Sequence, residues 1–537
     1  MKTSMDYPGL VKIVPGFDYV TIPQLLKQRA EEIPDSEFII FEDEPHTFSQ
    51  VYQRANQLAN GLLSLDVKKG EFVAIILPNS ADHVTAYLGI VCSGAVELPI
   101  NNAFRGKELK YILDHSETRT VITDAEHLPH VLDVWELKEG RTILCMGKSN
   151  VEGTIDYHEF VEKQPTTSPD VQMTVDDPAS MMYTSGSTAF PKGALISHRY
   201  KVCYGALSNW SYRLGKKDRI MLITPIFHAV ALFHGIMGSL HGGIPCAIIP
   251  RFSATAFWQD ARRYKATFVF AIGAIPAMLM NQPEAPDDAD NPVRVIWAFM
   301  TPKRVMEPFE KRFNVTIYDG LGQTECGRIL VNYPPLRKPG ALGLPYEMSD
   351  IKIVDEDDNT LPQGEIGEIC VRAPSIMLGY YKNPEATDQA FKNGWLHTGD
   401  NGYMDDDGIY WFTDRKKDTI RRRGKVISSF EVQDAISSHP KVEETACIAV
   451  ESDLAEEEIL AAIILKEGEA PPEFEELAEW CKERVSYYKV PRYWVYRKDF
   501  PKTPTFRIQK FLLRKEINMK EVIEIPVTKP GQEIKRV

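Results

Sequence analysis

The sequence predicts an α/β protein whose main sheets are parallel and covered by helices on both faces. Over most of the chain, short β-rich runs alternate with segments of helical periodicity. The β-rich runs, such as Phe72–Leu77 (FVAIIL), are apolar throughout, which is typical of strands buried on both faces. The C-terminal part has a different charge balance and predicts a smaller α+β domain.

The elements of the N-terminal part can be placed in order. Apolar residues between Phe48 and Leu62 recur at three- and four-residue steps, which predicts an amphipathic helix. Thr47 and Gln50 resemble a capping box at its start. Strands are then expected at 72–77, 95–99 and 120–124, and helices at 81–92 and around 107–113.

A domain boundary is expected at a basic run. Asp414–Lys425 holds seven basic residues against two acids. The chain from Lys416 onward carries a net charge of +1, and residues 1–415 carry −14, which together give the total of −13. We therefore expect domains at 1–415 and 416–537, the second with helices at 430–438 and 473–485 and strands at 445–450 and 459–465.

Composition excludes several classes of protein. The chain has 537 residues, enough to bury a large core without disulfides or metals. A net charge of −13 makes it a poor general nucleic-acid binder. No two of its eight cysteines are close enough for a CxxC or zinc pattern, and Asp6 and Pro8 interrupt any signal peptide at the start. These observations predict a cytoplasmic protein.

One long uncharged segment tests that expectation. From Ile220 to Pro250 there is no Lys, Arg, Asp or Glu, and a membrane-spanning helix needs only about 20 apolar residues. However, Pro225 and Pro245 lie near its ends and Gly242–Gly243 interrupts it. The segment therefore favours a strand, helix, turn and strand buried in a soluble domain.

A loop rich in hydroxyl groups and glycine is the strongest candidate for a binding site. It runs from Tyr183 to Gly193 (YTSGSTAFPKG), follows apolar residues and precedes a segment expected to be helical. Backbone N–H groups, hydroxyls and one lysine can surround phosphate oxygens. A Walker A loop would need Ser or Thr directly after the lysine, but here Gly193 follows Lys192.

This loop resembles the phosphate loop of the acyl-adenylate-forming superfamily, which includes acyl-CoA synthetases, luciferases and peptide-synthetase adenylation domains. Ala189 stands where the family usually has glycine. The resemblance implies an ATP-binding enzyme. Its phosphate-binding residues would be Thr184, Ser185, Gly186, Ser187, Thr188 and Lys192.

The segment Tyr318–Glu325 (YDGLGQTE) resembles a second nucleotide-binding motif of the superfamily. The resemblance implies that Glu325, together with Thr184, holds Mg²⁺, a hard cation that prefers oxygen ligands. Thr324 would contact the α-phosphate. Leu321 stands where the family commonly has an aromatic ring on the adenine. Asp319, Gly320 and Leu321 would line the nucleotide.

Two later segments resemble the ribose and hinge motifs. In Gly394–Asp400 (GWLHTGD), the resemblance implies that Asp400 accepts hydrogen bonds from the ribose hydroxyls. In Asp414–Asp418 (DRKKD), Arg415 would also bind the ribose, and Lys417 would be the pivot of a mobile C-terminal domain. A solvated charged face is the alternative for this run.

The acyl pocket is expected around a histidine. His228 in PIFH matches the family's segment at the pocket, although a lone histidine in apolar sequence is more often a buried core residue, as expected for His234 and His241. Ala298–Pro302 (AFMTP) replaces a Gly-Gly-Ala-Pro turn and predicts a reshaped pocket. The candidate residues carry no charge, which disfavours a dianionic acid; they are His228, Phe233, Phe299 and Met300.

Near the C-terminus, Phe500–Lys510 (FPKTPTFRIQK) resembles the segment that carries the family's catalytic lysine. In the family this lysine follows glycine, but here the pair is Phe506-Arg507. Arg507 keeps the charge and is the expected catalytic cation. Lys510 is the alternative, and on an extended segment it would point to the opposite face.

The resemblance covers about residues 20–515. It implies a large N-terminal domain of two doubly wound subdomains and a small β-rich part, followed by a mobile α+β domain. The function implied is an AMP-forming, ATP-dependent carboxylic acid–CoA ligase, most similar to the carnitine/betaine–CoA and aryl–CoA ligase branches. Its catalytic residues would be Lys192, Thr324, Glu325 and Arg507.

The acid would be small or medium-sized, or carnitine-like. Two alternatives stay open. The first is an adenylating enzyme that loads a carrier protein, although no carrier domain precedes the end at Val537. The second is a non-catalytic nucleotide-binding homologue, because Ala189, Leu321 and Arg507 depart from the family pattern.

Overall fold

The computed structural model describes residues 19–184, 191–272, 274–299, 301, 303–333, 337–346, 348–416, 418–422, 425–451, 457–503 and 508–525. The chain forms two compact units. The first contains the chain up to Thr301, Val305–Ile351 and Val371–Leu396. The second contains Pro302–Arg304, Lys352–Cys370 and the chain from His397 onward. The boundary expected between 415 and 416 stays a prediction.

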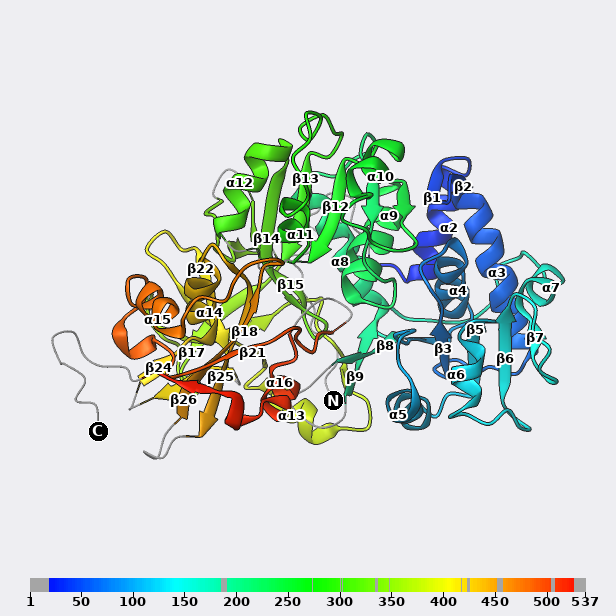
Figure 1. Ribbon diagram of the computed structural model, residues 1–537. Helices are drawn as coiled ribbons and strands as arrows, with labels where there is room; N and C mark the ends of the chain where they lie inside the picture. The colour runs from blue at the N-terminus through cyan, green and yellow to red at the C-terminus, as the bar shows by residue number, and fades with distance from the viewer. Residues whose placement is uncertain are drawn as a thin grey trace. The chain divides into compact units, whose positions relative to one another are not determined.

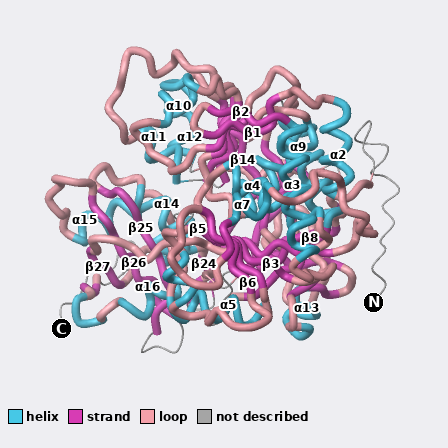
Figure 2. Tube along the Cα trace, turned by 90° about the vertical axis from the view of Figure 1, so that its right-hand side faces the viewer, coloured by secondary structure: helices cyan, strands magenta, loops and turns pink. Residues whose placement is uncertain are grey.

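The larger sheet of the first unit is parallel over its central strands and antiparallel at both ends. Its strands lie side by side in Figures 1 and 2. Its nine strands, in sheet order, are β16 (Leu344–Pro345), β15 (Gly327–Asn332), β14 (Thr316–Gln323), β13 (Val295–Phe299), β12 (Phe268–Ile272), β10 (Ile220–Leu222), β11 (Cys246–Ile248), β1 (Glu37–Phe41) and β2 (Glu44–Thr47).

The second sheet of this unit is parallel from β8 to β7, and two antiparallel strands extend it beyond β8. Its eight strands, in sheet order, are β19 (Gly379–Tyr380), β9 (Lys192–Ser197), β8 (Pro178–Thr184), β4 (Val96–Pro99), β3 (Phe72–Ile76), β5 (Thr120–Asp124), β6 (Thr142–Met146) and β7 (Ile155–Asp156).

Helices cover the second sheet as the sequence predicts. The capping box at Thr47 and Gln50 is formed and begins α3. Helices α5 and α6 share one buried apolar cluster with β3–β6, and right-handed crossover places α4 on the other face. The helices of the first unit are α2 (Ile22–Glu32), α3 (Phe48–Ser64), α4 (Ala81–Cys92), α5 (Gly106–Ser116), α6 (Leu128–Leu132), α7 (Tyr157–Glu162), α8 (His198–Tyr212), α9 (Met237–Gly242), α10 (Phe257–Arg263), α11 (Ala274–Met280), α12 (Lys303–Phe313) and α13 (Pro384–Ala390).

The uncharged segment 220–250 folds as strand, helix, turn and strand, which confirms the expectation. It contains β10, a π-helix η1 (Val230–Ile236), α9 and β11. Gly243 ends α9 with φ 62°, a left-handed conformation that glycine adopts without strain. Among the described residues, no helix combines the length and the apolar character needed to cross a bilayer.

The second unit contains a β-rich sheet and an α+β part. The β-rich sheet of this unit contains β17 (Asp350–Val354), β18 (Gly367–Arg372), β21 (Trp395–Met404) and β22 (Tyr410–Arg415). The short strand β20 (Phe391–Lys392) belongs to the first unit. The remaining elements are the hairpin β23 (Ile420–Arg422) and β24 (Lys425–Ile427), the sheet of β25 (Val442–Glu451), β26 (Glu457–Leu465), β27 (Tyr493–Tyr496) and β28 (Ile523–Glu524), the helices α14 (Ser429–Ser437), α15 (Phe474–Lys482) and α16 (Lys510–Glu516), and two short 3₁₀ turns, η2 (Tyr487–Lys489) and η3 (Met519–Glu521).

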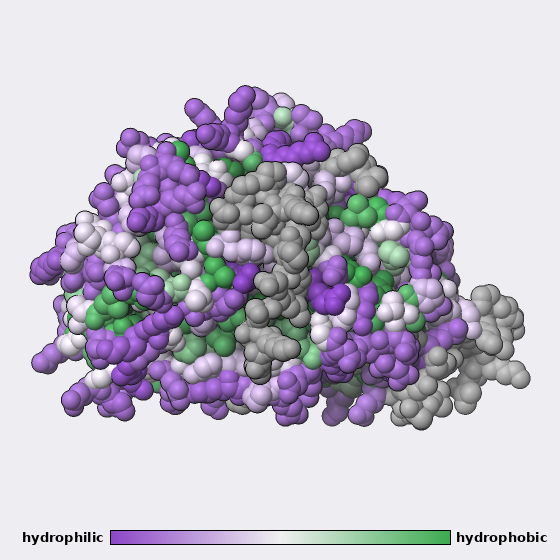
Figure 3. All heavy atoms as spheres, turned by 180° about the vertical axis from the view of Figure 1, so that it is seen from behind, coloured by the Kyte–Doolittle hydropathy of each residue, from purple (hydrophilic) through white to green (hydrophobic). Residues whose placement is uncertain are grey.

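The predicted architecture is confirmed, with two local corrections. The segment directly after the phosphate loop is strand β9, and the expected helix begins only at His198, because Ser197 caps it. Lys510 does not lie on an extended segment: it opens α16, whose residues are mostly good helix formers. The face of the molecule drawn in Figure 3 is covered mainly by hydrophilic side chains.

Buried histidines should make the stability of the first unit depend on pH. Burial lowers the pKa of four histidines, to about 3 for His198 and about 4 for His83, His228 and His241. In the unfolded chain each returns to about 6.5. Between these values the unfolded state binds more protons, so the free energy of unfolding rises with pH.

We expect full stability at pH 7 and a loss of about 1.4 kcal/mol per pH unit for each such histidine as pH falls below about 6.5. Urea denaturation of the whole chain between pH 7 and pH 5 measures this slope. In His83→Asn the slope should decrease by the contribution of one proton. A free energy of unfolding that does not change over this range would contradict the expectation.

Candidate active site

Three chain segments meet at the carboxylate of Glu325, in the turn between β14 and β15. Its Oε1 accepts hydrogen bonds from the hydroxyl of Thr184 at 3.1 Å and from the hydroxyl of Tyr380 at 2.9 Å. Its backbone carbonyl accepts a hydrogen bond from the N–H of Met377 at 2.8 Å. The ends of β8, β14 and β19 are therefore joined at one half-buried acid.

Glycine allows this turn to form. A Cβ at Gly320 would lie 2.3 Å from the carbonyl oxygen of Leu330, so only glycine lets β14 and β15 approach this closely. The pairing also shifts register between Leu321 and Gly322, which marks a bulge just before Glu325. Close approach and bulge together direct Glu325 toward β8.

The two ends of the phosphate loop are cross-strand partners. Thr184 ends β8, and Lys192 lies opposite it at the start of β9. The Nζ of Lys192 lies 4.3 Å from the ring centroid of Tyr380, a cation–π contact. The loop residues predicted between them lie outside the described residues; they are Ser185, Gly186, Ser187 and Thr188.

Two tyrosines of this site were missed by the sequence analysis. Tyr380 donates to Glu325 and lies below Lys192, and Tyr200 of α8 donates to the backbone carbonyl of Thr324 at 3.0 Å. Burial, and then the Glu325 carboxylate, raises the pKa of the Tyr380 phenol, which therefore stays neutral and donates. The pairing of β19 with β9 joins residues far apart in sequence, so no local pattern indicates it.

The expected nucleotide-lining residues are mostly inside the fold. Asp319 is buried and accepts hydrogen bonds from the N–H groups of Thr301 at 3.1 Å and Gly320 at 2.7 Å. Leu321 is completely buried, whereas Thr324 is half-buried next to Glu325. The roles of Asp319, Gly320, Leu321 and Thr324 at the nucleotide stay predictions.

The expected pocket residues lie in and near two elements: Phe233 lies on η1, His228 just before it, and Phe299 on β13. Burial lowers the pKa of His228 to about 4, so its imidazole is neutral at pH 7. Its Nδ1 accepts a hydrogen bond from the N–H of Val230 at 3.3 Å, which leaves the proton on Nε2 as a donor. Phe233 packs against Tyr200 with ring centroids 5.1 Å apart, and Phe299 ends β13; Met300 lies outside the described residues.

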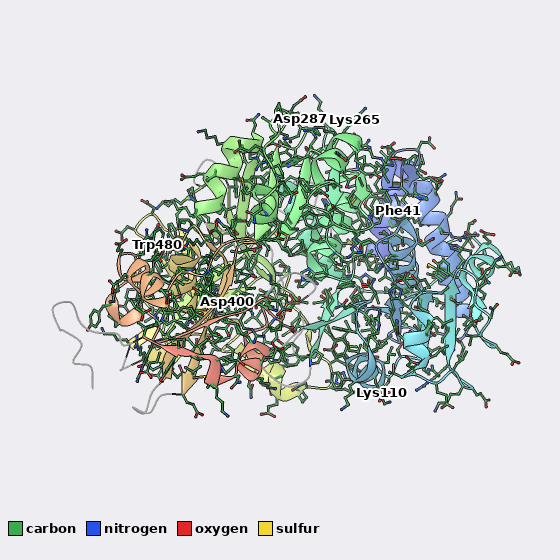
Figure 4. All side chains as sticks on the ribbon, viewed as in Figure 1. Phe41, Lys110, Lys265, Asp287, Asp400 and Trp480 are labelled. Atoms are coloured by element: carbon green, nitrogen blue, oxygen red, sulfur yellow. The ribbon has the colours of Figure 1, made fainter. Side chains whose placement is uncertain are left out.

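In the second unit, the structure brings together the two expected ribose-binding residues. Asp400, labelled in Figure 4, lies on β21 directly opposite Arg415 of β22. The Nε of Arg415 is 3.3 Å from Oδ1 of Asp400, whose side chain is almost fully buried. The expected hinge residue Lys417 lies outside the described residues.

Of the two candidate catalytic cations, Lys510 lies among the described residues. Arg507 lies outside the described residues. Lys510 donates from Nζ to the hydroxyl of Ser429 at 2.6 Å. Burial raises the pKa of the nearby Asp414, and the charge of Lys510 acts in the opposite direction. Lys510 therefore has structural partners within its own unit.

The residues at Glu325 fit a magnesium ion. One carboxylate and the hydroxyl of Thr184 offer only oxygen ligands, and Glu325 is half-buried. Mg²⁺ prefers this ligand chemistry and usually keeps waters and substrate phosphates as its remaining ligands. The assignment of Thr184 and Glu325 as metal ligands stays a prediction.

Comparison with known proteins identifies the family. A model described as AMP-binding enzyme matches residues 26–381, and one described as AMP-binding enzyme C-terminal domain matches residues 431–507. The chain belongs to the AMP-binding enzyme family. This confirms the expected superfamily and its two-part organisation.

Several relatives cover nearly the whole chain. It is 31% identical over 481 residues to a crotonobetaine/carnitine–CoA ligase of Salmonella arizonae and 32% identical over 480 residues to that of Citrobacter koseri, covering 86% of this chain and 92% of each relative. The anthranilate CoA ligase AuaEII, solved with anthranoyl-AMP, has a TM-score of 0.86 at 29% identity over 93% of this chain and 97% of its own. A benzoate CoA ligase from Burkholderia xenovorans LB400 shares the fold, with a TM-score of 0.84 at 24% identity over 92% of this chain and 100% of its own.

The hydroxyl of Tyr380 should contribute to activity separately from its ring. We expect Tyr380→Phe to lower kcat for pyrophosphate release about 10- to 100-fold, because Glu325 loses a hydrogen bond to a charged group. The aromatic face below Lys192 is kept in this variant. Initial rates at saturating ATP measure the effect.

Tyr381→Phe is the matched control. Tyr381 packs against Phe72 and His115, with ring centroids 4.9 and 5.6 Å away, and makes no described contact with Glu325. Its variant should keep kcat. Equal rates for wild type and Tyr380→Phe would show that the hydroxyl does not orient Glu325.

Proposed function

We propose that this chain joins a carboxylic acid to coenzyme A in two steps. A carboxylate oxygen attacks the α-phosphorus of ATP, and the bond to pyrophosphate breaks to leave acyl-AMP. The thiol of coenzyme A then takes the acyl group and AMP leaves. The class expected from the sequence, an AMP-forming acid–CoA ligase using ATP and Mg²⁺, is confirmed by the family and its relatives. Loading of a carrier protein and a non-catalytic role are not favoured.

The observation that carries this proposal for the chain itself is the contact set at Glu325. Thr184 and Tyr380 orient the Glu325 carboxylate, and Lys192 places a cation over the ring of the same Tyr380. Mg²⁺, when bound, neutralises charge on the triphosphate. The protein groups then act by positioning and by stabilising charge that moves toward pyrophosphate.

The acid is proposed to be small or medium-sized, with a carnitine-like acid as the alternative. His228 offers a neutral Nε2–H donor, and Phe233 and Phe299 offer apolar surface. Relatives named for crotonobetaine or carnitine and for anthranilate support this size range. The cytoplasm is the proposed location, supported by eight cysteines that are all buried and free.

We expect Lys192→Ala and Glu325→Gln each to lower kcat for adenylation by about 100- to 1,000-fold and to change KM for the acid much less. Both residues act on charge that grows in the transition state. Pyrophosphate release with a panel of acids, with and without coenzyme A, measures the effect. If either variant keeps wild-type kcat, its assignment to the phosphate loop or the metal is wrong.

We expect Arg507→Ala to abolish acyl-AMP formation but to leave thioester formation from supplied acyl-AMP largely intact, because the cation acts on the carboxylate and α-phosphate. Arg507→Lys should keep activity. Lys510→Ala is the control, since Lys510 already binds Ser429. Loss of adenylation in Lys510→Ala but not in Arg507→Ala would show that the expected register is wrong.

A further inference from the structure

Arg328 is a buried cation without a counter-charge in the first unit. It lies on β15 and is 1% exposed. Its Nη2 donates to the hydroxyls of Ser208 at 3.3 Å and Tyr346 at 3.0 Å, both neutral groups. Among the residues that the structure describes, no carboxylate forms an ion pair with it. A buried charge normally has such a partner, because removal from water is costly.

Several buried donors around this guanidinium also lack acceptors. Within the described part of the chain, Nε and Nη1 of Arg328, the hydroxyl of Tyr212 and the indole Nε1 of Trp297 have no hydrogen-bond partner. The guanidinium carbon lies 4.3 Å from the ring centroid of Tyr212 and 5.8 Å from that of Trp297. Unsatisfied buried donors are uncommon. The rings of Tyr212 and Trp297 lie against the guanidinium, so these donors belong to residues around one positive charge, which suits an anion with several acceptor oxygens.

This place lies within reach of the proposed reaction centre. Arg328 is three residues after Glu325, a separation of at most about 10 Å along the chain. Helix α8 spans the same interval: Tyr200 donates to the carbonyl of Thr324, and Ser208, about 12 Å further along the helix, accepts from Arg328. One face of α8 therefore runs from the reacting end to the guanidinium, past the pocket residue Phe233, which packs against Tyr204 of the same face.

The surrounding polar groups hold the guanidinium in place. His234 of η1 makes hydrogen bonds through Nε2 to the Tyr204 hydroxyl at 2.5 Å and through Nδ1 to the Ser208 hydroxyl at 2.9 Å. Both nitrogens are used, as expected for a buried core histidine, and burial lowers its pKa well below the ordinary value. His234 is therefore neutral, so it neither compensates nor repels a second charge.

We propose that Arg328, Tyr212 and Trp297 bind a second, anionic group at the far end of the acid. The enzyme would then select dicarboxylic acids, or acids with an equivalent anionic substituent, over acids with an apolar or cationic end. A quaternary ammonium group would need the aromatic faces that Arg328 already occupies. The sequence disfavoured a dianionic acid because Arg328 was not among the residues assigned to the pocket. This inference rests on the proposed function.

The test compares matched acids in the pyrophosphate-release assay with the full chain. The pairs are adipate with hexanoate, isophthalate with 3-methylbenzoate and terephthalate with 4-methylbenzoate; carnitine is the cationic acid. For at least one pair we expect kcat/KM to be about tenfold or more higher for the diacid. Arg328→Gln should remove this preference by lowering kcat/KM for the diacid alone. Arg328→Lys, which keeps the charge, should retain part of it.

Arg312→Gln is the matched control, since Arg312 is a mostly buried arginine of the same unit that pairs with Asp288 at 2.6 Å. It should leave the preference unchanged. If Arg328→Gln does not fold, Tyr212→Phe and Trp297→Phe remove single donors and should each reduce the preference. The inference is overturned if the wild type prefers no diacid, if it prefers carnitine, or if folded Arg328→Gln lowers both members of a pair equally.

Failure of the proposed function can be told apart from failure of this inference. If no acid releases pyrophosphate, the ligase assignment fails, and calorimetric titration of the full chain with isophthalate, adipate and terephthalate decides the inference. Binding of any of them that is lost in Arg328→Gln and kept in Arg312→Gln supports it. Absence of binding by all three, or binding that does not depend on Arg328, overturns it.

Discussion

The first unit depends on one carboxylate to join its two sheets at the site. Glu325 belongs to the turn between β14 and β15 of the nine-stranded sheet, whereas Thr184 and Tyr380 belong to the eight-stranded sheet. A half-buried carboxylate that accepts two hydroxyl hydrogen bonds has a fixed orientation. The pairing of β8 with β9 places Lys192 opposite Thr184, so Lys192 lies at the same junction.

Much of the fold could be predicted because its signals are local. The capping box at Thr47, the apolar strand at Phe72 and the glycine turn after α9 each depend on neighbouring residues, and each was placed correctly. The start of α8 and the state of Lys510 were placed less well. The cap at Ser197 decides where α8 begins, whereas α16 begins without a capping side chain, and such helix boundaries are weakly encoded.

The site could be predicted only where a motif carries it. Thr184, Lys192 and Glu325 lie in recognisable segments. Asp400 and Arg415 are neighbours on paired strands, and their shared role at the ribose stays a prediction. Tyr380 and Arg328 had no such signal. Tyr380 meets Glu325 only because β19 pairs with β9, and Arg328 is a single basic residue in an apolar strand whose burial depends on packing against α8.

Arg328, which has no ion-pair partner within the described part of the chain, has a consequence for stability as well as for selection. Residues that evolve only for stability rarely bury a cation among neutral groups, because an apolar side chain of similar volume would avoid the desolvation cost. The aromatic faces around Arg328 reduce that cost but do not supply a counter-charge. A ligand that brings the missing negative charge would therefore bind more tightly than its area of contact suggests. The same site would oppose a ligand that brings positive charge, so selection between acids would come from repulsion as well as attraction.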